Sequence, residues 1–222
     1  MLAKNVSGSI EFWRHLSQFG WARSSLSNAP MEEKLQNLLF KNFNSSKIGV
    51  VKVLRPLTVV QAKQNSMSSF IGTGAQPLHT DCAYQSIPPR FVLLKCISKG
   101  EHQCPTNIGE IMWRRLETDR PAEIYDAVWT FWNHLSHSFY STIVHGVGDQ
   151  ARMRFDPFCM KLAGNIKDSN SLSGILLKYM NIRSEYLNDG EWLLINNWRV
   201  VHGRGLGAEL SPTRRIERSY WS

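Results

Sequence analysis

The chain has 222 residues, of which 42% are apolar, and this is enough for one domain with a sizeable core. Its 26 Lys and Arg against 18 Asp and Glu give a net charge of +8, which favours an anionic partner or substrate without naming one. No run of 18 apolar residues occurs, and the N-terminus has no apolar block of the signal-peptide kind, so we expect a cytoplasmic protein without a membrane span.

Two helices are predicted at the start of the chain. Apolar residues recur at helical spacing over 9–19, and a proline in a favoured first-turn position opens the second helix, over 30–40. The apolar run 48–54 predicts a buried strand, and 91–97 predicts another strand. Between them, residues 66–76 are rich in Ser, Gly and Gln, which predicts a mobile loop.

The second half mixes helices and strands. An apolar face at helical spacing predicts a helix over 121–134, and a further helix follows over 172–179. Short strands over 139–144 and 151–155 are separated by glycines and could pair as a hairpin. The last two strands, the first of them behind an Asp-Gly turn, cover residues 191–196 and 214–221. Helices that precede strands with insertions indicate an α+β chain around a β-barrel-like core.

Two short segments far apart in the chain offer a set of metal ligands. His79 and Asp81 are spaced i and i+2, and residues at this spacing in a strand point to the same side. His202, in the segment Asn-Asn-Trp-Arg-Val-Val-His-Gly-Arg (196–204), could supply a third ligand. Two imidazoles and one carboxylate form the facial triad that holds non-haem Fe(II) and leaves positions open. Alone, a His-x-Asp triplet is weak evidence in a chain with seven histidines.

Arginines follow the last of these histidines. Arg214 and Arg218 lie 12 and 16 residues after His202. An arginine presents a two-pronged fork to a carboxylate, as a co-substrate with two carboxylates would require. Arg215 competes with Arg214 for this role. In an alternating strand the two would face opposite ways, whereas Arg214 and Arg218 would share a face.

This combination resembles the TauD/TfdA-like family of Fe(II)- and 2-oxoglutarate-dependent dioxygenases, which includes taurine dioxygenase, γ-butyrobetaine hydroxylase and the clavaminate synthase group. The matching segments extend over most of the chain from residue 77 on, and the block ending in His-Gly-Arg is the most specific. They are 77–81 (Pro-Leu-His-Thr-Asp), 88–92 (Pro-Pro-Arg-Phe-Val), 154–157 (Arg-Phe-Asp-Pro), 196–204 and 214–221.

The resemblance implies a fold and a chemistry. The expected fold is a single α+β domain over residues 1–222, with a double-stranded β-helix core (a cupin-like jelly roll) and flanking helices. The expected cofactor is Fe(II), with 2-oxoglutarate as co-substrate and O2 as oxidant. Succinate and CO2 would be released as a C–H bond of the substrate is oxidised, usually by hydroxylation. Because a carboxylate stands at Asp81, halogenation is not expected.

The resemblance also implies a role for each site residue. The expected iron ligands are His79, Asp81 and His202, and no catalytic residue is implied beyond the metal centre. Arg214 and Thr106 would bind the distal carboxylate of 2-oxoglutarate. Arg218 would face the substrate or the other end of the co-substrate. Trp198, which is close to His202 in the sequence, is a further candidate for contact with the substrate. Two departures from the family pattern are the short chain and the segment before Thr106, which lacks the usual glycine-rich turn.

The substrate is expected to be a small molecule, anionic or amino-acid-like, either free or presented by an acidic carrier protein. One alternative is an oxygenase that acts on nucleic acid or protein, but the scattered basic charge disfavours nucleic acid. A second is a non-catalytic jelly-roll binding module, which the complete ligand set disfavours.

The remaining histidines and the cysteines are given structural interpretations. His134 and His137 are spaced i and i+3, but they lie in an aromatic stretch without a nearby carboxylate, which favours packing over metal binding. The cysteines form no CxxC pair, so we expect thiols in a reducing compartment. They are Cys82, Cys96, Cys104 and Cys159.

Overall fold

The fold was obtained as a computed structural model, which describes residues 10–25, 30–64, 66–132, 137–163 and 169–222. Its centre is a five-stranded antiparallel sheet in the order β1-β11-β3-β13-β2. The strands of this sheet are β1 (Trp21–Arg23), β11 (Trp192–Asn196), β3 (Phe91–Ser98), β13 (Arg215–Trp221) and β2 (Lys47–Leu54). The strands predicted over 91–97, 191–196 and 214–221 are therefore confirmed, with ends shifted by a residue.

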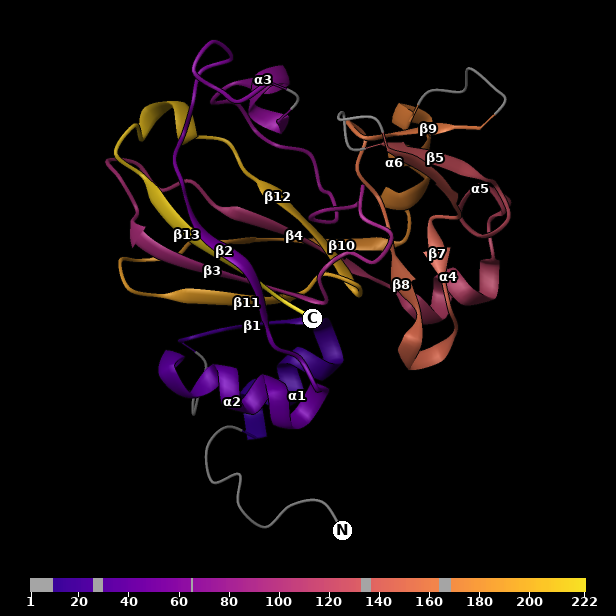
Figure 1. Cartoon of the computed structure of the whole chain (residues 1–222), viewed down its shortest axis with the longest axis horizontal. Helices are drawn as coiled ribbons and strands as arrows, with labels where there is room; N and C mark the ends of the chain where they lie inside the picture. Colours follow the sequence, from indigo (N-terminus) through magenta and orange to yellow (C-terminus); the bar gives the residue numbers. More distant parts are fainter. Residues whose placement is uncertain (1–9, 26–29, 65, 133–136, 164–168) are drawn as a thin grey trace.

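A smaller sheet faces the large one (Figure 1). It has the antiparallel order β10-β4-β12, with β10 at Met180–Glu185, β4 at Thr106–Ile111 and β12 at Val200–Arg204. Both sheets contribute to one buried apolar cluster, which holds Val92 and Leu94 of β3 beside Ile108 of β4 and Val200 of β12. The two sheets thus form a sandwich, and its interior lies between them. None of the three strands of the small sheet was predicted from the sequence.

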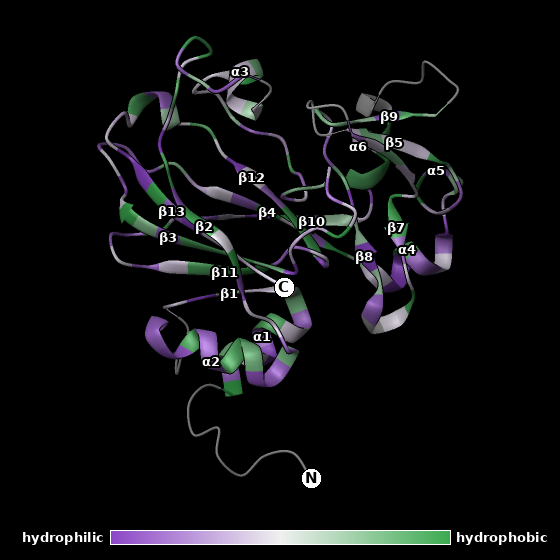
Figure 2. Cartoon of the chain, in the orientation of Figure 1, coloured by the Kyte–Doolittle hydropathy of each residue, from purple (hydrophilic) through white to green (hydrophobic). Residues whose placement is uncertain are grey.

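Two helices cover the outer face of the large sheet. They are α1 (Ile10–Phe19) and α2 (Glu32–Phe43), and both carry apolar and polar residues on different sides (Figure 2). Their apolar sides bury Phe12 and Leu35 against Phe91 and Trp192 of the sheet. The predicted helices are confirmed, although the second begins two residues later than expected, because Pro30 precedes the helix cap.

Strand β2 corrects a prediction. It was expected to be buried, but it lies at the edge of the large sheet, where it pairs with β13. Val50 and Val53 are 79% and 60% exposed. An apolar run fits an edge strand as well as a central one, because apolar content alone does not report how many sheet neighbours a strand has.

A second region packs beside the sandwich (Figure 1). It contains a three-stranded sheet, a two-stranded hairpin and three helices around a second core. Its strands are β5 (Trp129–Trp132), β6 (Ser138–Ser141), β7 (Val144–His145), β8 (Arg152–Met153) and β9 (Met160–Leu162), and its helices are α4 (Trp113–Asp119), α5 (Ala122–Tyr125) and α6 (Ser169–Leu177). Val201 of β12 joins this core, so the region is anchored on the strand that carries His202.

Three predictions in this region are corrected or refined. The helix expected over 121–134 ends at α5, and the following Trp-Thr-Phe-Trp forms β5, where aromatic side chains alternate between buried and half-buried. The strand expected over 139–144 is split between β6 and β7. Its end does pair with the 151–155 segment, since Val144 lies opposite Met153. The predicted pair of His134 and His137 includes a residue outside the described part of the chain.

The loop expected before His79 is partly helical. Residues Met67–Ile71 form a short helix, α3, and the backbone then runs without regular structure to the site. All four cysteines are free thiols, three of them buried, as expected. Among the described helices, none combines the length and the hydropathy needed to cross a bilayer.

Candidate metal centre

Backbone pairing brings the two ligand-bearing segments together. His79 and His202 exchange both N–H···O bonds, each 2.9 Å, and Gln76 N–H donates to Arg204 O at 2.8 Å. Residues directly opposite each other in an antiparallel pair point to the same side, and the two imidazole centroids are 5.1 Å apart. Gly203 permits this approach, because a Cβ there would lie 2.5 Å from the Gln76 carbonyl oxygen.

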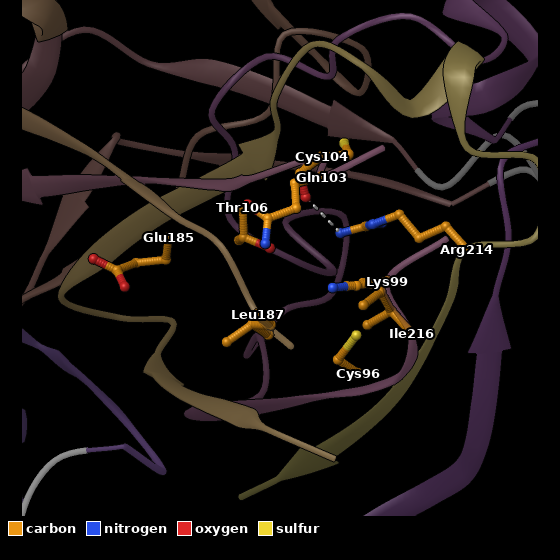
Figure 3. A pocket seen from close by; sticks show the side chains of 9 residues that line it. All are labelled: Cys96, Lys99, Gln103, Cys104, Thr106, Glu185, Leu187, Arg214 and Ile216. Atoms are coloured by element: carbon orange, nitrogen blue, oxygen red, sulfur yellow. Dashed lines mark hydrogen bonds between the residues drawn. The ribbon is translucent and has the colours of Figure 1, made fainter. Parts of the chain in front are cut away.

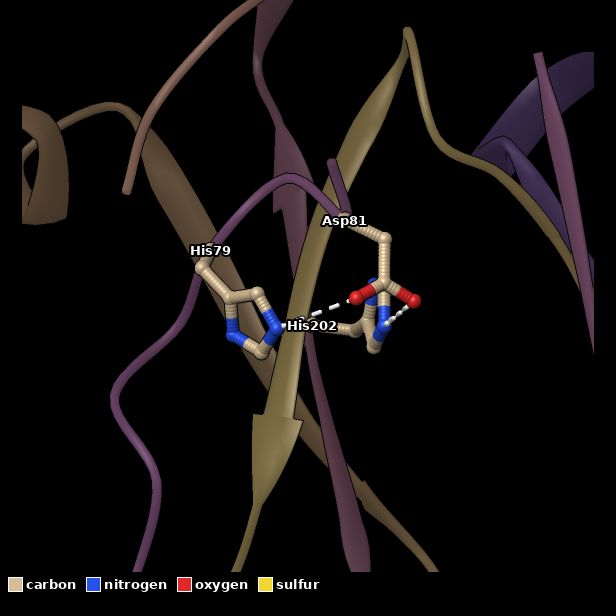
Figure 4. A group of neighbouring side chains, drawn as sticks. All are labelled: His79, Asp81 and His202. Carbon is tan, nitrogen blue, oxygen red and sulfur yellow. Dashed lines mark ion pairs between the residues drawn. The ribbon is translucent and has the colours of Figure 1, made fainter. Parts of the chain in front are cut away.

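Asp81 completes the group from a turn rather than from a regular strand. Its backbone N–H donates to Asn197 Oδ1 at 2.9 Å, and its carbonyl accepts from Asn197 Nδ2 at 3.0 Å. The carboxylate then lies between the two histidines, with Oδ1 3.5 Å from His79 Nε2 and Oδ2 3.4 Å from His202 Nε2 (Figure 4). The structure thus brings together the three residues predicted as ligands.

This group is suited to hold a metal ion. The candidate ligand atoms all lie within 4.8 Å of one another, and each of the three residues is 5–7% exposed. His79 Nδ1 lies 2.9 Å from the Pro77 carbonyl, to which it can donate a proton, so Nε2, which faces Asp81, is the nitrogen that could bind a metal. Two imidazole nitrogens and a carboxylate oxygen suit Fe(II) among the first-row metals. The donor set therefore fits the metal that the sequence implied.

Arg218 helps to keep the carboxyl group of Asp81 deprotonated. Its Nη1 lies 3.0 Å and 3.2 Å from the two oxygens of Asp81. Burial alone would raise the pKa of Asp81, but the charge of Arg218 and hydrogen bonds from both imidazoles outweigh it and hold this pKa well below its usual value. The carboxylate is therefore anionic, as a metal ligand must be.

The two imidazoles differ in their pKa. Burial lowers the pKa of His202 below its usual value and keeps its ring neutral. Burial also lowers the pKa of His79, but the hydrogen bond to Asp81 and its negative charge outweigh this effect, so that the pKa is raised overall. A metal that binds here would have to displace the proton that this raised pKa favours.

A separate cavity holds two other predicted residues. Thr106, at the start of β4, and Arg214, just before β13, line it together with Lys99 (Figure 3). Arg215 instead folds back, and its Nη1 donates to the carbonyls of Pro212 and Arg214 at 2.8 Å. Of the two competing arginines, Arg214 is the one that lines this cavity.

Lys99 was missed from the sequence. It is a second cation beside Arg214. The remaining lining consists of two thiols, two aliphatic side chains, the amide of Gln103 and the carboxylate of Glu185, which pairs with Arg23 at 3.0 Å. The position of Lys99 in the sequence could have indicated it, because it directly follows β3 and begins the connection that leads to Thr106. A cation at a strand end beside a predicted anion site is the feature that could have indicated it.

Arg218 and Trp198 were predicted to face the substrate. Arg218 forms an ion pair with Asp81, and its contact with substrate stays a prediction. The Trp198 indole donates to the Pro88 carbonyl at 2.8 Å, and the guanidinium groups of Arg90 and Arg152 lie 5.3 Å and 5.2 Å from its ring. These contacts give Trp198 a packing role in the structure, and its contact with substrate stays a prediction.

Sequence reasoning also missed the residues that support the ligands. Asn197 is fully buried. Its side chain accepts a hydrogen bond from the Asp81 backbone N–H and donates to the carbonyls of Asp81 and, at 2.9 Å, Pro89. Arg154 and Arg204 bond the backbone on either side of the ligand segment. The available signal was that all three polar residues fall inside the matched segments 154–157 and 196–204.

No protein-family model matches the sequence, and no curated protein matches it at a significant level. Solved structures with the same fold were found. A non-haem iron oxygenase, OrfP, in complex with Fe and α-ketoglutaric acid has a TM-score of 0.60 and 19% identity, covering 85% of this chain and 63% of its own. OrfP with a hydroxylated L-arginine gives a TM-score of 0.61 at 19% identity, over 85% and 64% of the two chains.

An asparagine oxygenase in complex with Fe(II), hydroxyasparagine and succinate has a TM-score of 0.59 at 15% identity, covering 78% of this chain and 56% of its own. The chain thus spans about half to two thirds of the length of these structures. At such low identity the similarity establishes the fold, an α+β arrangement of antiparallel sheets also found in non-haem iron oxygenases.

Proposed function

We propose that the protein is an Fe(II)- and 2-oxoglutarate-dependent oxygenase of the TauD/TfdA-like kind, with a single double-stranded β-helix domain. The observation that carries this proposal is the buried group of His79, Asp81 and His202, whose candidate ligand atoms all lie within 4.8 Å of one another. The structural neighbours support it, since several of them hold Fe together with α-ketoglutaric acid or succinate.

Each residue of the proposed centre has a defined task. The two imidazoles and the carboxylate would hold the ion, and the charge of Asp81 would offset part of its positive charge. Arg218 and Asn197 hold Asp81 in place, the first through its carboxylate and the second through its peptide. The bound iron would supply O2 activation, with 2-oxoglutarate as the electron source.

Arg214 and Thr106 are proposed to bind the distal carboxylate of 2-oxoglutarate. A guanidinium and a hydroxyl group in one cavity supply charge and hydrogen bonds to such a group, and Lys99 adds a second positive charge. Register relates this cavity to the metal centre, because Thr106 lies opposite Arg204 on β12, two residues beyond His202. An elongated dicarboxylate running along β12 would contact both.

The proposed substrate is a small amino-acid-like or anionic molecule, hydroxylated at a C–H bond. The neighbours bound to hydroxylated arginine and asparagine support an amino-acid-like molecule, and the net charge of +8 supports an anionic one. Presentation by an acidic carrier protein is a further proposal. It predicts turnover of a carrier-bound substrate and little turnover of the same free amino acid.

The test is anaerobic addition of Fe(II) and 2-oxoglutarate to the metal-free protein. We expect a weak visible charge-transfer band, and its loss in His79→Ala. His145→Ala is the matched control, since His145 is an exposed residue at the end of β7. Failure of the wild type to bind 2-oxoglutarate in an Fe(II)- or Mn(II)-dependent way by calorimetry would contradict the proposal and favour a non-catalytic module. Substrate-stimulated release of succinate from a panel of amino acids would then identify the substrate.

A further inference from the structure

The segment that carries two of the three proposed ligands has little regular structure of its own. Between α3 and β3, the bridge of His79 with His202 is the sheet pairing that the described residues make, and Asp81 lies in a turn. Metal affinity depends on holding ligands in a productive geometry before the ion arrives. Besides a few backbone hydrogen bonds to β12 and Phe155, the order of this segment therefore depends on side chains outside it.

Arg154 binds the backbone directly after Asp81. Its guanidinium donates to the carbonyls of Ala83 at 2.6 Å and Ser86 at 2.7 Å, and also to that of Gln85. All three acceptors belong to the turn that begins at Asp81. One guanidinium with five donors in a fixed plane can fix several carbonyls at once.

The surroundings of Arg154 hold it rigidly. The residue is 5% exposed, and its guanidinium lies 5.3 Å and 4.7 Å from the rings of Phe131 and Phe139. Burial, with a smaller effect of Arg152, lowers the pKa of Arg154 to about 10. Within the described chain it pairs with no carboxylate, so the turn carbonyls are its main polar partners. The Nη1 and Nη2 donors are bonded to these carbonyls, which offsets part of the cost of burying the charge, while Nε is buried without a hydrogen-bond partner in the part of the chain that the structure describes.

Arg204 binds the backbone before His79. Its Nε donates to Gly74 O at 3.0 Å, and its Nη2 donates to Gly72 O at 2.7 Å and to Gly74 O at 2.6 Å. Burial lowers its pKa. No carboxylate of the described residues forms an ion pair with Arg204 either. Its own carbonyl accepts from Gln76, so both its backbone and its side chain hold the approach to His79.

We propose that Arg154 and Arg204 are positioning residues that brace the ligand segment from its two sides and thereby set the metal affinity of the centre. Arg204 comes from β12, two residues beyond His202, and fixes the segment relative to that ligand. Arg154 follows β8 and fixes the turn after Asp81 relative to the second region. Neither residue bonds a ligand side chain. This inference rests on the proposed metal centre, but its structural half concerns the order of the segment with or without metal.

The test compares Arg154→Met and Arg204→Met with Arg154→Lys, Arg204→Lys and wild type. Arg120→Met is the control, because Arg120 also lies over an aromatic ring, that of Tyr125, but pairs with Asp126 at the surface. Mn(II) dissociation constants are measured from the free-ion electron paramagnetic resonance signal. We expect binding to weaken about 10–100-fold in the Met variants. A Lys variant keeps the charge without the fork, so it should recover a minor part of the loss.

Hydrogen exchange of the metal-free proteins separates positioning from general destabilisation. We expect faster exchange confined to residues 76–86, with β3 and β11 protected as in the wild type. If a Met variant does not fold, the Lys variant takes its place in both measurements. Unchanged Mn(II) binding in the variants, or faster exchange spread evenly over the sheets, would overturn the inference. If the wild type itself binds no Mn(II), the proposed function fails, and the exchange pattern alone decides whether the two arginines order the segment.

Discussion

Asp81 is the residue on which the charges of the centre converge. Its carboxylate is 6% exposed and is contacted by Arg218 and by both proposed imidazole ligands. Removing one member of a buried ion pair leaves the other charge without a partner, and this costs more than the pair itself contributes. The metal site is therefore coupled to the stability of the metal-free fold.

This coupling predicts the effect of Asp81→Asn. The free energy of unfolding should fall by about 3 kcal/mol, at the low end for breaking a buried ion pair, because the Arg218 side chain keeps 22% exposure. Urea denaturation of the metal-free protein measures it. In the double variant with Arg218→Met, most of the stability should return while metal binding stays absent. A single variant as stable as the wild type would contradict the importance of this pair.

A second prediction concerns Arg214, just before β13, and Arg215, at its first position. Arg214→Met should weaken binding of 2-oxoglutarate to the Mn(II)-loaded protein by about 10–150-fold, the equivalent of the roughly 1.5–3 kcal/mol of a hydrogen bond to a charged group. Arg215→Met is the control, because its side chain bonds backbone carbonyls outside the cavity. Calorimetry measures both, and the reverse order of effects would assign the role to Arg215.

At the scale of elements, the close approach of residues 76–79 to β12 depends on the absence of a side chain at Gly203. Gly203 lies between His202 and Arg204, and its Cα faces the carbonyls of Gln76 and Pro77. Gly203→Ala should force the 76–79 segment away from β12. We expect weaker Mn(II) binding and a loss of about 1–3 kcal/mol in the free energy of unfolding, as for other overpacked sites.

A glycine in another element provides the matched control. Gly174 lies inside α6, and a methyl group added there would meet no atom within 4 Å, so Gly174→Ala should raise stability by about 0.5–1 kcal/mol. Denaturant titration of the two variants should show opposite signs. Two changes of the same sign would mean that crowding at Gly203 is not what distinguishes it.

The elements also show how far sequence reasoning reached. The strands of the large sheet with strong apolar runs were predicted, since β3 and β11 are buried on both faces. The small sheet was missed because β4 and β10 carry polar and charged residues, such as Asn107 and Arg183, and its apolar pattern is weak. The local pattern of apolar residues does not reveal a strand that is stabilised mainly by pairing with neighbouring strands.

The candidate site, like the strands, was predicted only in part. The proposed ligands were predicted because their spacing and their flanking residues can be read from short segments of the sequence. The supporting residues were not, because Arg154 bonds a turn that begins about 70 positions earlier in the sequence, with a separation of 71 from Ala83. A contact of that range leaves no periodic trace, and a buried arginine looks like any other arginine in a chain with many.

At the scale of the whole molecule, the proposed metal centre lies where separate parts of the fold meet. One proposed ligand comes from β12 of the sandwich, and two come from a segment that is hydrogen-bonded to Phe155 and Arg154 of the second region. A metal ion bound there would link the two regions. Binding to the folded state alone stabilises the whole chain by mass action.

Metal binding should therefore raise the melting temperature of the protein. At a free Mn(II) concentration of 100 times the dissociation constant, the gain is about 2.7 kcal/mol, or roughly 5–11 °C for a chain of this size. Thermal unfolding followed by circular dichroism, with and without Mn(II), measures it. His202→Ala should remove the shift and His145→Ala should retain it, because the first lies in the centre and the second is exposed at a strand end. An equal shift in both variants would place the bound ion elsewhere on the molecule.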